Sequence, residues 1–115
     1  MQSDSRREPR FNVHWRARAQ LPDGPFIELR VKDISDSGMG LAADQPVPAA
    51  TTLDVCVQVP DPGNPAQMIA VAGKAKVAYV AMRGYEFRIG VTWAERDDAG
   101  RELMSRWMRK VHFGF

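Results

Sequence analysis

Three arginines near the N-terminus have the chemistry to hold a compact anion. Arg6, Arg7 and Arg10 put three guanidinium groups within five residues. A guanidinium donates two parallel hydrogen bonds to a phosphate, a carboxylate or a guanine edge. Arg6 and Arg10 lie four residues apart, so both can grip one small ligand from a segment that folds back on the protein. On composition alone, a charged and solvated tail is the simpler interpretation.

The second notable stretch spans residues 33–41 and reads Asp-Ile-Ser-Asp-Ser-Gly-Met-Gly-Leu. Asp, Ser and Gly favour turns because their side chains bond the local backbone or because they tolerate a positive φ. A plain hairpin needs only two such residues, whereas six of the eight positions from Asp33 to Gly40 are polar or glycine. The excess predicts a loop with a function. The alternative is a turn whose Asp and Ser side chains cap their own backbone.

The sequence shows no catalytic constellation. His14 and His112 lie far apart, and neither has the spacing of a metal ligand. Asp33 and Asp36 lack the further carboxylates and the spacing of a calcium loop. No glycine-rich phosphate loop leads from a strand into a helix. The single cysteine, Cys56, excludes an internal disulfide and is expected to fill the core. We therefore expect no enzyme, no metal site and no cofactor.

Length and composition bound the class of protein. The 115 residues correspond to one domain, and the apolar fraction of 44% is typical of a globular chain. No apolar run approaches the ~18 residues of a membrane span, and the charged N-terminus does not resemble a secretory signal. With one cysteine, a cytoplasmic location without membrane insertion is expected. A net charge of +2 is too mild for long nucleic acid, and a small anionic ligand fits better.

The rest of the chain supplies the elements that position these residues. Residues 1–11 show no periodicity and predict a flexible arm. Beyond residue 12, apolar and polar residues alternate with the period of a β-strand. The strand-like segments lie at 13–21, 27–32, 39–43, 53–59, 68–82 and 87–93. Segment 68–82 is predicted to be one bent strand, or two with a bulge at Gly73. The prolines of 60–65 predict a loop.

The period changes near the C-terminus. Asp97 and Asp98 are good N-cap residues, and apolar residues then recur at helical spacing to about His112. We expect the apolar side chains of this helix, such as Trp107, to pack on the strands. The pattern predicts a mainly β fold, a six-stranded antiparallel (split) barrel with a C-terminal α-helix and a flexible N-terminal arm. The arm spans 1–11 and the barrel domain 12–115.

Taken together, the two polar groups resemble the motifs of the PilZ domain family. They form Arg-x-x-x-Arg followed, one hairpin later, by Asp-x-Ser-x-x-Gly, at Arg6, Arg10, Asp33, Ser35 and Gly38. The hairpins, the glycine at Gly90 in the last strand and the final helix agree with this family over nearly the whole chain. The resemblance implies a bacterial receptor for the second messenger cyclic di-GMP, built as a six-stranded antiparallel barrel without catalytic activity.

The resemblance also implies a role for each arginine of the first motif. Arg6 and Arg10 would bind the O6/N7 edge of guanine or a phosphate, and could stack on a purine face. Arg7 would add a phosphate contact. The arm would be mobile without ligand and would wrap over the barrel with ligand, presenting a new surface to an unidentified downstream protein.

The second motif would recognise the base. Asp33 would accept hydrogen bonds from N1–H and the N2 amino group of guanine, which distinguishes guanine from adenine. Ser35 would offer a hydroxyl to phosphate or base. Gly38 would let the backbone approach the ligand where a Cβ would collide.

Several alternatives remain open at this stage. The ligand can be one cyclic di-GMP or an intercalated pair, and the protein a monomer or a homodimer. Some proteins similar to this family bind no nucleotide and act as adaptors in pilus assembly or motility. Those adaptors typically lack the arginine motif, which this chain keeps at Arg6 and Arg10. Motility and biofilm formation are the processes that the receptor interpretation implies.

Overall fold

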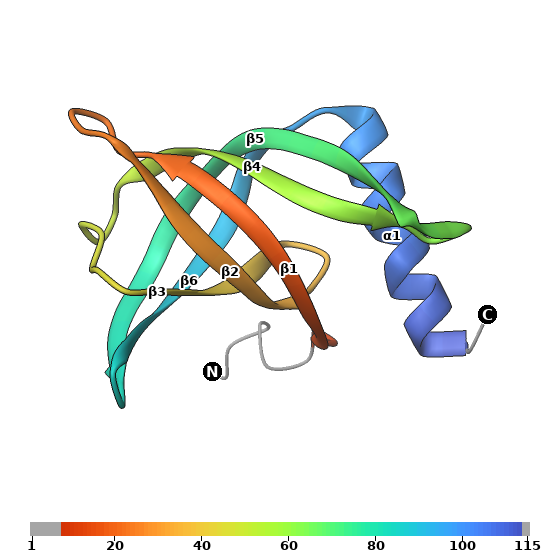
Figure 1. The fold of residues 1–115 in the computed structure, drawn as a ribbon, viewed down its shortest axis with the longest axis horizontal. Helices are drawn as coiled ribbons and strands as arrows, with labels where there is room; N and C mark the ends of the chain where they lie inside the picture. Colours follow the sequence, from red (N-terminus) through yellow and green to blue (C-terminus); the bar gives the residue numbers. More distant parts are fainter. Residues whose placement is uncertain (1–7, 114–115) are drawn as a thin grey trace.

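Six antiparallel strands and one helix make up the fold (Figure 1). A computed structural model describes residues 8–113 of the protein, and side chains up to residue 110. The elements are β1 Phe11–Gln20, β2 Phe26–Ile34, β3 Gly38–Ala43, β4 Thr52–Asp61, β5 Asn64–Arg83, β6 Glu86–Arg96 and α1 Asp98–Phe113. The mainly β architecture predicted from the sequence is confirmed.

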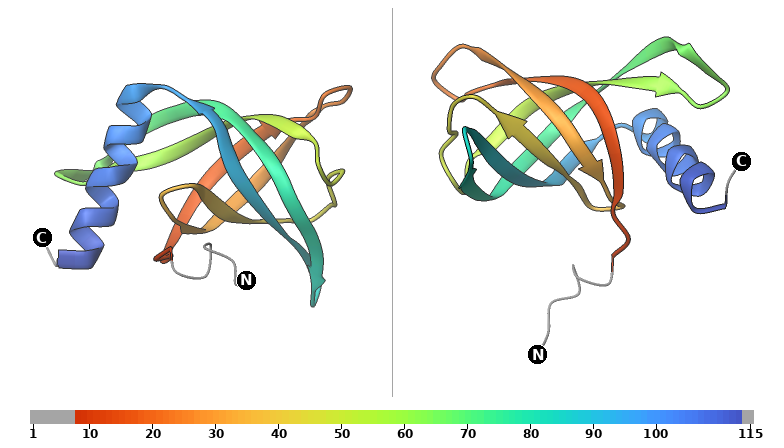
Figure 2. Two further views of the ribbon diagram at one scale, coloured as in Figure 1. Left: turned by 180° about the vertical axis from the view of Figure 1, so that it is seen from behind. Right: turned by 60° about the horizontal axis from the view of Figure 1, so that its bottom comes forward.

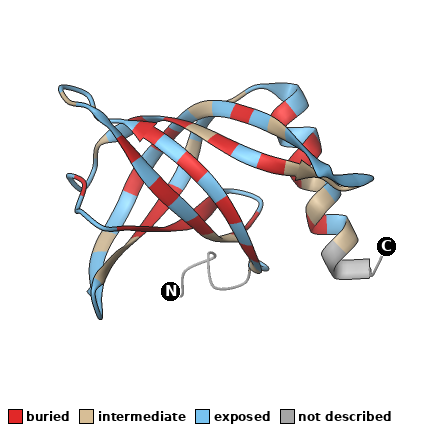
Figure 3. Ribbon diagram, in the orientation of Figure 1, coloured by how far each residue is buried: buried red, intermediate tan, exposed pale blue. Residues whose placement is uncertain are grey.

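The strands close into a ring in the order β1-β2-β3-β6-β5-β4. Closure occurs at β1, where Ala17 lies opposite Leu29 of β2 on one side and Val57 of β4 on the other. Buried and exposed residues alternate along the strands, because successive side chains point to opposite faces (Figure 3). The inward side chains form the core, and the largest of them are Ile34, Met39, Leu41, Leu53, Ile89, Val31, Val57, Val59, Val71 and Val77.

The loop predicted for residues 33–40 is shorter in the structure than the composition of this segment predicts. Asp33 and Ile34 continue β2, Gly38 already begins β3, and only residues 35–37 form the turn. The reason is that Ile34 and Met39 are core residues that pair across the two strands, so burial extends the hairpin to its tip. The prediction of a long functional loop is corrected to a tight hairpin. The loop predicted for the proline-rich stretch 60–65 is also shorter, because β4 ends at Asp61 and β5 begins at Asn64.

Segment 68–82 belongs to one long strand, β5, of 20 residues. β5 pairs with β4 over its first part and with β6 over its second part. Its register with β6 shifts between Lys74 and Ala75, next to Gly73, and again between Val77 and Tyr79. A Cβ at Gly73 would collide with the backbone oxygen of Glu95, so this bend needs a glycine.

The helix α1 begins where the sequence predicts, with Asp97 accepting a hydrogen bond from the backbone N–H of Gly100 at 2.7 Å. Its side chains Met104 and Met108 are buried. The Trp107 ring packs edge-on against Trp15 of β1, with ring centroids 5.7 Å apart. Figure 2 shows α1 beside the projecting part of β4 and β5. No helix in the described part of the chain is long and apolar enough to span a membrane.

Candidate ligand-binding site

Four residues form a row across the outer face of the ring. Asp33 of β2 lies opposite Gly40 of β3, Gly40 opposite Gly90 of β6, and Gly90 opposite Tyr79 of β5. Neighbouring strands are about 4.8 Å apart, so the row spans about 14 Å. A Cβ at Gly40 would lie 2.6 Å from the Asp33 carboxylate, and one at Gly90 would collide with the Tyr79 ring. The two glycines therefore let Asp33 and Tyr79 lie flat over the sheet.

This arrangement offers two kinds of recognition at one surface. The Asp33 carboxylate is a hydrogen-bond acceptor at one end of the row. The Tyr79 ring, 53% exposed, is an aromatic platform at the other end. Base–aromatic stacking is worth ~1–3 kcal/mol per base in nucleic-acid complexes. The row thus suits a planar group that carries N–H donors at its edge.

Arg10 and Asp33, both predicted site residues, are in direct contact. The guanidinium of Arg10 donates through Nε at 3.0 Å and through Nη2 at 2.7 Å to Oδ1 of Asp33. Arg10 immediately precedes β1, and Asn12 of β1 pairs with Asp33 of β2, which brings the N-terminal segment to the hairpin tip. The structure therefore brings together one residue of each motif. Their role toward a ligand stays a prediction.

A second contact holds the N-terminal segment to the turn. The Ser37 hydroxyl donates to the Glu8 carboxylate at 2.7 Å. Burial raises the pKa of Glu8, but hydrogen bonds from Ser37 and Ser35 and the charge of Arg10 outweigh it, so the pKa is lowered overall. Arg6 and Arg7, the other predicted arm residues, lie outside the described residues, as does most of the predicted arm at 1–11.

Ser35 and Gly38 form the turn itself. Ser35 is 4% exposed, and its Oγ accepts from the backbone N–H of Gly38 at 3.2 Å. The backbone N–H of Ser35 donates to the Gly38 carbonyl at 3.0 Å. A Cβ at Gly38 would collide with the carbonyl oxygen of Val91 on β6. The turn therefore requires both residues for its own geometry, and their predicted ligand contacts stay predictions.

Sequence reasoning missed Tyr79, Gly40 and Glu8. Alternation from the buried Val77 predicts that Tyr79 points inward, but the register shift between these residues turns Tyr79 outward. Gly40 could have been found from the sequence, because Gly38 and Gly40 are two residues apart and therefore lie on the same face of β3. Glu8 had none, because its partner Ser37 is 29 residues away.

Among the residues that the structure describes, no group of three or more His, Cys, Asp or Glu side chains is placed to hold a metal ion.

Comparison with protein-family models gives one match. The model of the PilZ domain matches residues 4–110 of this chain. The search of curated proteins finds no match.

Several solved structures share the fold. The inhibitor of motility MotI/DgrA of Bacillus subtilis has a TM-score of 0.76 and 13% identity, covering 98% of this chain and 54% of its own. YcgR of Escherichia coli in complex with c-di-GMP has a TM-score of 0.74 and 15% identity, covering 92% and 45%. The MrkH–c-di-GMP complex of K. pneumonia has a TM-score of 0.74 and 20% identity, covering 96% and 53%. This chain thus spans about half the length of these proteins.

Proposed function

Since this chain belongs to the PilZ domain family, we propose that it is a receptor for cyclic di-GMP, with no catalytic activity of its own. One observation carries the proposal. Arg10 contacts Asp33 at one end of a row of residues that continues through Gly40 and Gly90 to Tyr79. Two similar structures, of YcgR and of MrkH, contain c-di-GMP. The ligand presents guanine edges, purine faces and phosphates, which are the groups that these side chains can recognise.

We propose that different residues of the site recognise different parts of one guanine. Asp33 accepts from the guanine N1–H and N2 amino groups, and Arg10 donates to the O6/N7 edge or to a phosphate. Tyr79 stacks on the base or on its neighbour. Arg6 and Arg7 supply further phosphate contacts from the N-terminal segment. Ser35 and Gly38 shape the turn that carries Asp33 and contact the ligand from there.

For a ligand to bind Asp33, the Arg10–Asp33 ion pair must break, or the Asp33 carboxylate must accept hydrogen bonds from Arg10 and from the ligand together. The two side chains are 42% and 18% exposed. Ion pairs at exposed sites contribute only ~0–1 kcal/mol, so rearranging this one costs little. A guanine that bonds to both side chains offsets that loss with several charge-assisted hydrogen bonds.

We propose that this N-terminal segment transmits the ligand-binding signal to a downstream protein. A ligand held by both Asp33 and the arginines orders residues 1–11 over the ring, and the new surface binds a downstream protein in the bacterial cytoplasm. The shift is limited by the difference in ligand affinity between the open and closed arm. Motility or biofilm control is the corresponding process, with the receptor acting as a monomer or homodimer.

Calorimetric titration with cyclic di-GMP tests the proposal. Arg10→Ala, Arg6→Ala and Tyr79→Ala are compared with the wild type. Arg109→Ala serves as the control because Arg109 lies on α1 and pairs there with Glu102. Loss of one charge-assisted contact is expected to cost about 2 kcal/mol, or about 30-fold in Kd. Unchanged Kd in Arg10→Ala would place the ligand elsewhere.

The second candidate is a protein–protein adaptor that binds no nucleotide. A thermal-shift series distinguishes the two, since a ligand that binds only the folded state raises Tm with its concentration. A wild-type protein whose Tm does not respond to cyclic di-GMP supports the adaptor.

A further inference from the structure

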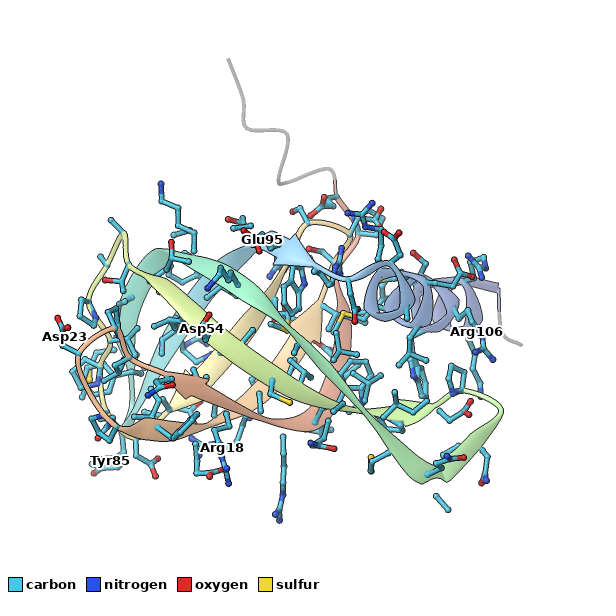
Figure 4. The ribbon with its side chains drawn as sticks, turned by 90° about the horizontal axis from the view of Figure 1, so that it is seen from above. Arg18, Asp23, Asp54, Tyr85, Glu95 and Arg106 are labelled. Carbon is cyan, nitrogen blue, oxygen red and sulfur yellow. The ribbon has the colours of Figure 1, made fainter. Side chains whose placement is uncertain are left out.

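A separate pocket of about 430 Å³ opens between the β2–β3 turn, the end of β6 and α1. Trp93 and Arg96 line it from β6, and Arg101 and Ser105 line it from α1. None of the residues of the Asp33–Tyr79 row lines this pocket. Figure 4 shows the end of β6, marked by Glu95, close to the start of α1. Ser35, which belongs to the proposed cyclic di-GMP site, also lines the pocket, so the pocket adjoins that site on the α1 side of the turn.

Arg96 is a partly buried cation without a carboxylate partner among the residues that the structure describes. Its guanidinium lies over the Trp93 ring, 4.9 Å from the centroid. Its terminal nitrogens contact the backbone oxygen of Asp36 and the sulfur of Met104, both at 3.4 Å. Burial lowers the pKa of Arg96, and the charge of Arg101 acts in the same direction, while Asp36 partly opposes both. Among described residues, neither arginine has an ion pair within 4.0 Å.

Two residues that line the pocket also carry buried donors without an acceptor in the described part of the chain. Trp93 Nε1 and Arg96 Nε are both buried, and neither has a hydrogen-bond partner in the described part of the chain. An indole and a guanidinium can only donate. Buried donors without partners are rare in folded proteins and raise the free energy of the folded state. Since these two atoms are covered, the donors that a ligand in the pocket can reach belong to the guanidinium groups of Arg96 and Arg101.

We propose that this pocket binds the phosphate group of a small organic molecule between Arg96 and Arg101. A tetrahedral phosphate accepts from several donors at once, and guanidinium forks match its geometry. The volume lies within the ~300–1,000 Å³ range of small-molecule sites, so it holds more than the phosphate alone. The organic part lies against Met104 and Met108, which also line the pocket.

The acidic lining residues restrict where an anion can lie. Asp36 and Glu95 line the same pocket and repel a negative charge. The phosphate is therefore confined to the side formed by Arg96 and Arg101. A binding site with this charge pattern takes one phosphate group and disfavours polyanions.

The Trp93 indole provides a direct readout by NMR. Its Nε1–H signal is assigned with Trp93→Phe, since the chain has only 3 tryptophans. The full chain is titrated at constant ionic strength with inorganic phosphate, with GMP and with cyclic di-GMP. We expect a saturable shift of this signal, with GMP binding more tightly than inorganic phosphate. The order of the three affinities identifies whether the phosphate comes from a free ion, a monoester or the cyclic dinucleotide.

Arg101→Ala is the decisive variant, because Arg101 is exposed and its removal leaves the Arg96–Trp93 stack in place. GMP affinity should fall roughly tenfold or more in this variant. Arg109→Ala, on the same helix outside the pocket, should bind GMP like the wild type. The proposal is overturned if none of the three probes gives a saturable shift, or if Arg101→Ala binds as tightly as the wild type. Because the readout is Trp93, failure of cyclic di-GMP binding at Asp33 and Tyr79 leaves this test intact.

Discussion

Gly38 and Gly40 are two residues apart on β3, yet they are glycines for different reasons. Gly38 faces the backbone of β6, where a Cβ would meet the carbonyl oxygen of Val91. Gly40 faces the side chain of Asp33, whose carboxylate would lie 2.6 Å from a Cβ. A backbone oxygen in a strand pair cannot move aside, whereas a carboxylate on the surface can. Gly38 therefore governs stability, and Gly40 governs the position of Asp33.

Gly38→Ala is expected to destabilise the fold by about 2 kcal/mol, since overpacking against a rigid neighbour costs ~1–3 kcal/mol. Urea unfolding of the ligand-free protein measures it. Gly63→Ala is the control, because the nearest atom to its Cβ is the Asp61 carboxylate at 3.6 Å. Equal midpoints for the two variants would contradict the role of Gly38 in strand packing.

Glu8 is the other residue whose environment makes a measurable difference. Its carboxylate is bound by Ser37, and its pKa lies below the usual 4.5, although burial alone would raise it. A group with a lowered pKa in the folded state stabilises the structure above its unfolded pKa, and loses that contribution as the pH falls through the folded value. The contact between the N-terminal segment and the turn is therefore complete at neutral pH and is lost in acid.

We expect the side-chain carboxyl of Glu8 to titrate below pH 4.5 in an NMR experiment. Ser37→Ala removes the hydroxyl that stabilises the charged form, so the midpoint should move upward. Arg109→Ala on α1 is the control variant, in which the midpoint of Glu8 should be the same as in the wild type. A wild-type midpoint at or above 4.5 would contradict the contact.

Among the elements, α1 buries Leu103 and Met104 in the core and contacts the β4–β5 hairpin through its C-terminal half. The Trp107 indole donates to the Pro60 carbonyl, and Lys110 donates to the Pro62 carbonyl at 2.9 Å. Both acceptors belong to the β4–β5 hairpin, which projects beside the helix (Figure 2). The same indole packs on Trp15 of β1. One side chain thus connects the last element to the first strand and to the middle of the chain.

Trp107→Ala is expected to lower the free energy of unfolding by about 3 kcal/mol, because truncating a packed tryptophan costs ~3–5 kcal/mol and this one is only partly buried. Trp107→Phe keeps most of the packing and loses the hydrogen bond, so about 1 kcal/mol is expected. Denaturant unfolding followed by circular dichroism gives both values. Arg109→Ala, exposed on the same helix, should change stability by less than ~0.5 kcal/mol. Losses of similar size for Trp107→Ala and Arg109→Ala would show that the helix is not anchored there.

Over the whole molecule, ring closure makes the strands depend on one another. Four pairings join consecutive strands in hairpins, and the pairings β1–β4 and β3–β6 join strands that are distant in sequence and close the ring. Detaching any strand from the ring breaks its hydrogen bonds to two neighbouring strands at once. The domain is therefore expected to unfold as one cooperative unit.

Tryptophan fluorescence and far-UV circular dichroism should then give the same urea midpoint. Fluorescence reports on Trp15, Trp93 and Trp107, which sit on β1, β6 and α1. Because closing the ring requires the non-local pairings β1–β4 and β3–β6, folding in milliseconds to seconds, on the order of other small all-β domains, is expected. A circular dichroism change that precedes the fluorescence change would mean that α1 melts separately.

The sequence by itself determined the strand pattern, the closing helix and the two motifs, because alternation, capping and turn chemistry are local properties of the chain. It could not determine that Arg10 contacts Asp33 across 23 residues, or that Arg96 of β6 and Arg101 of α1 line one pocket. Nor could it place Tyr79, whose outward direction follows from a register shift between β5 and β6. Those features depend on which distant strands pair and where their pairing slips, and only the closed ring decides that.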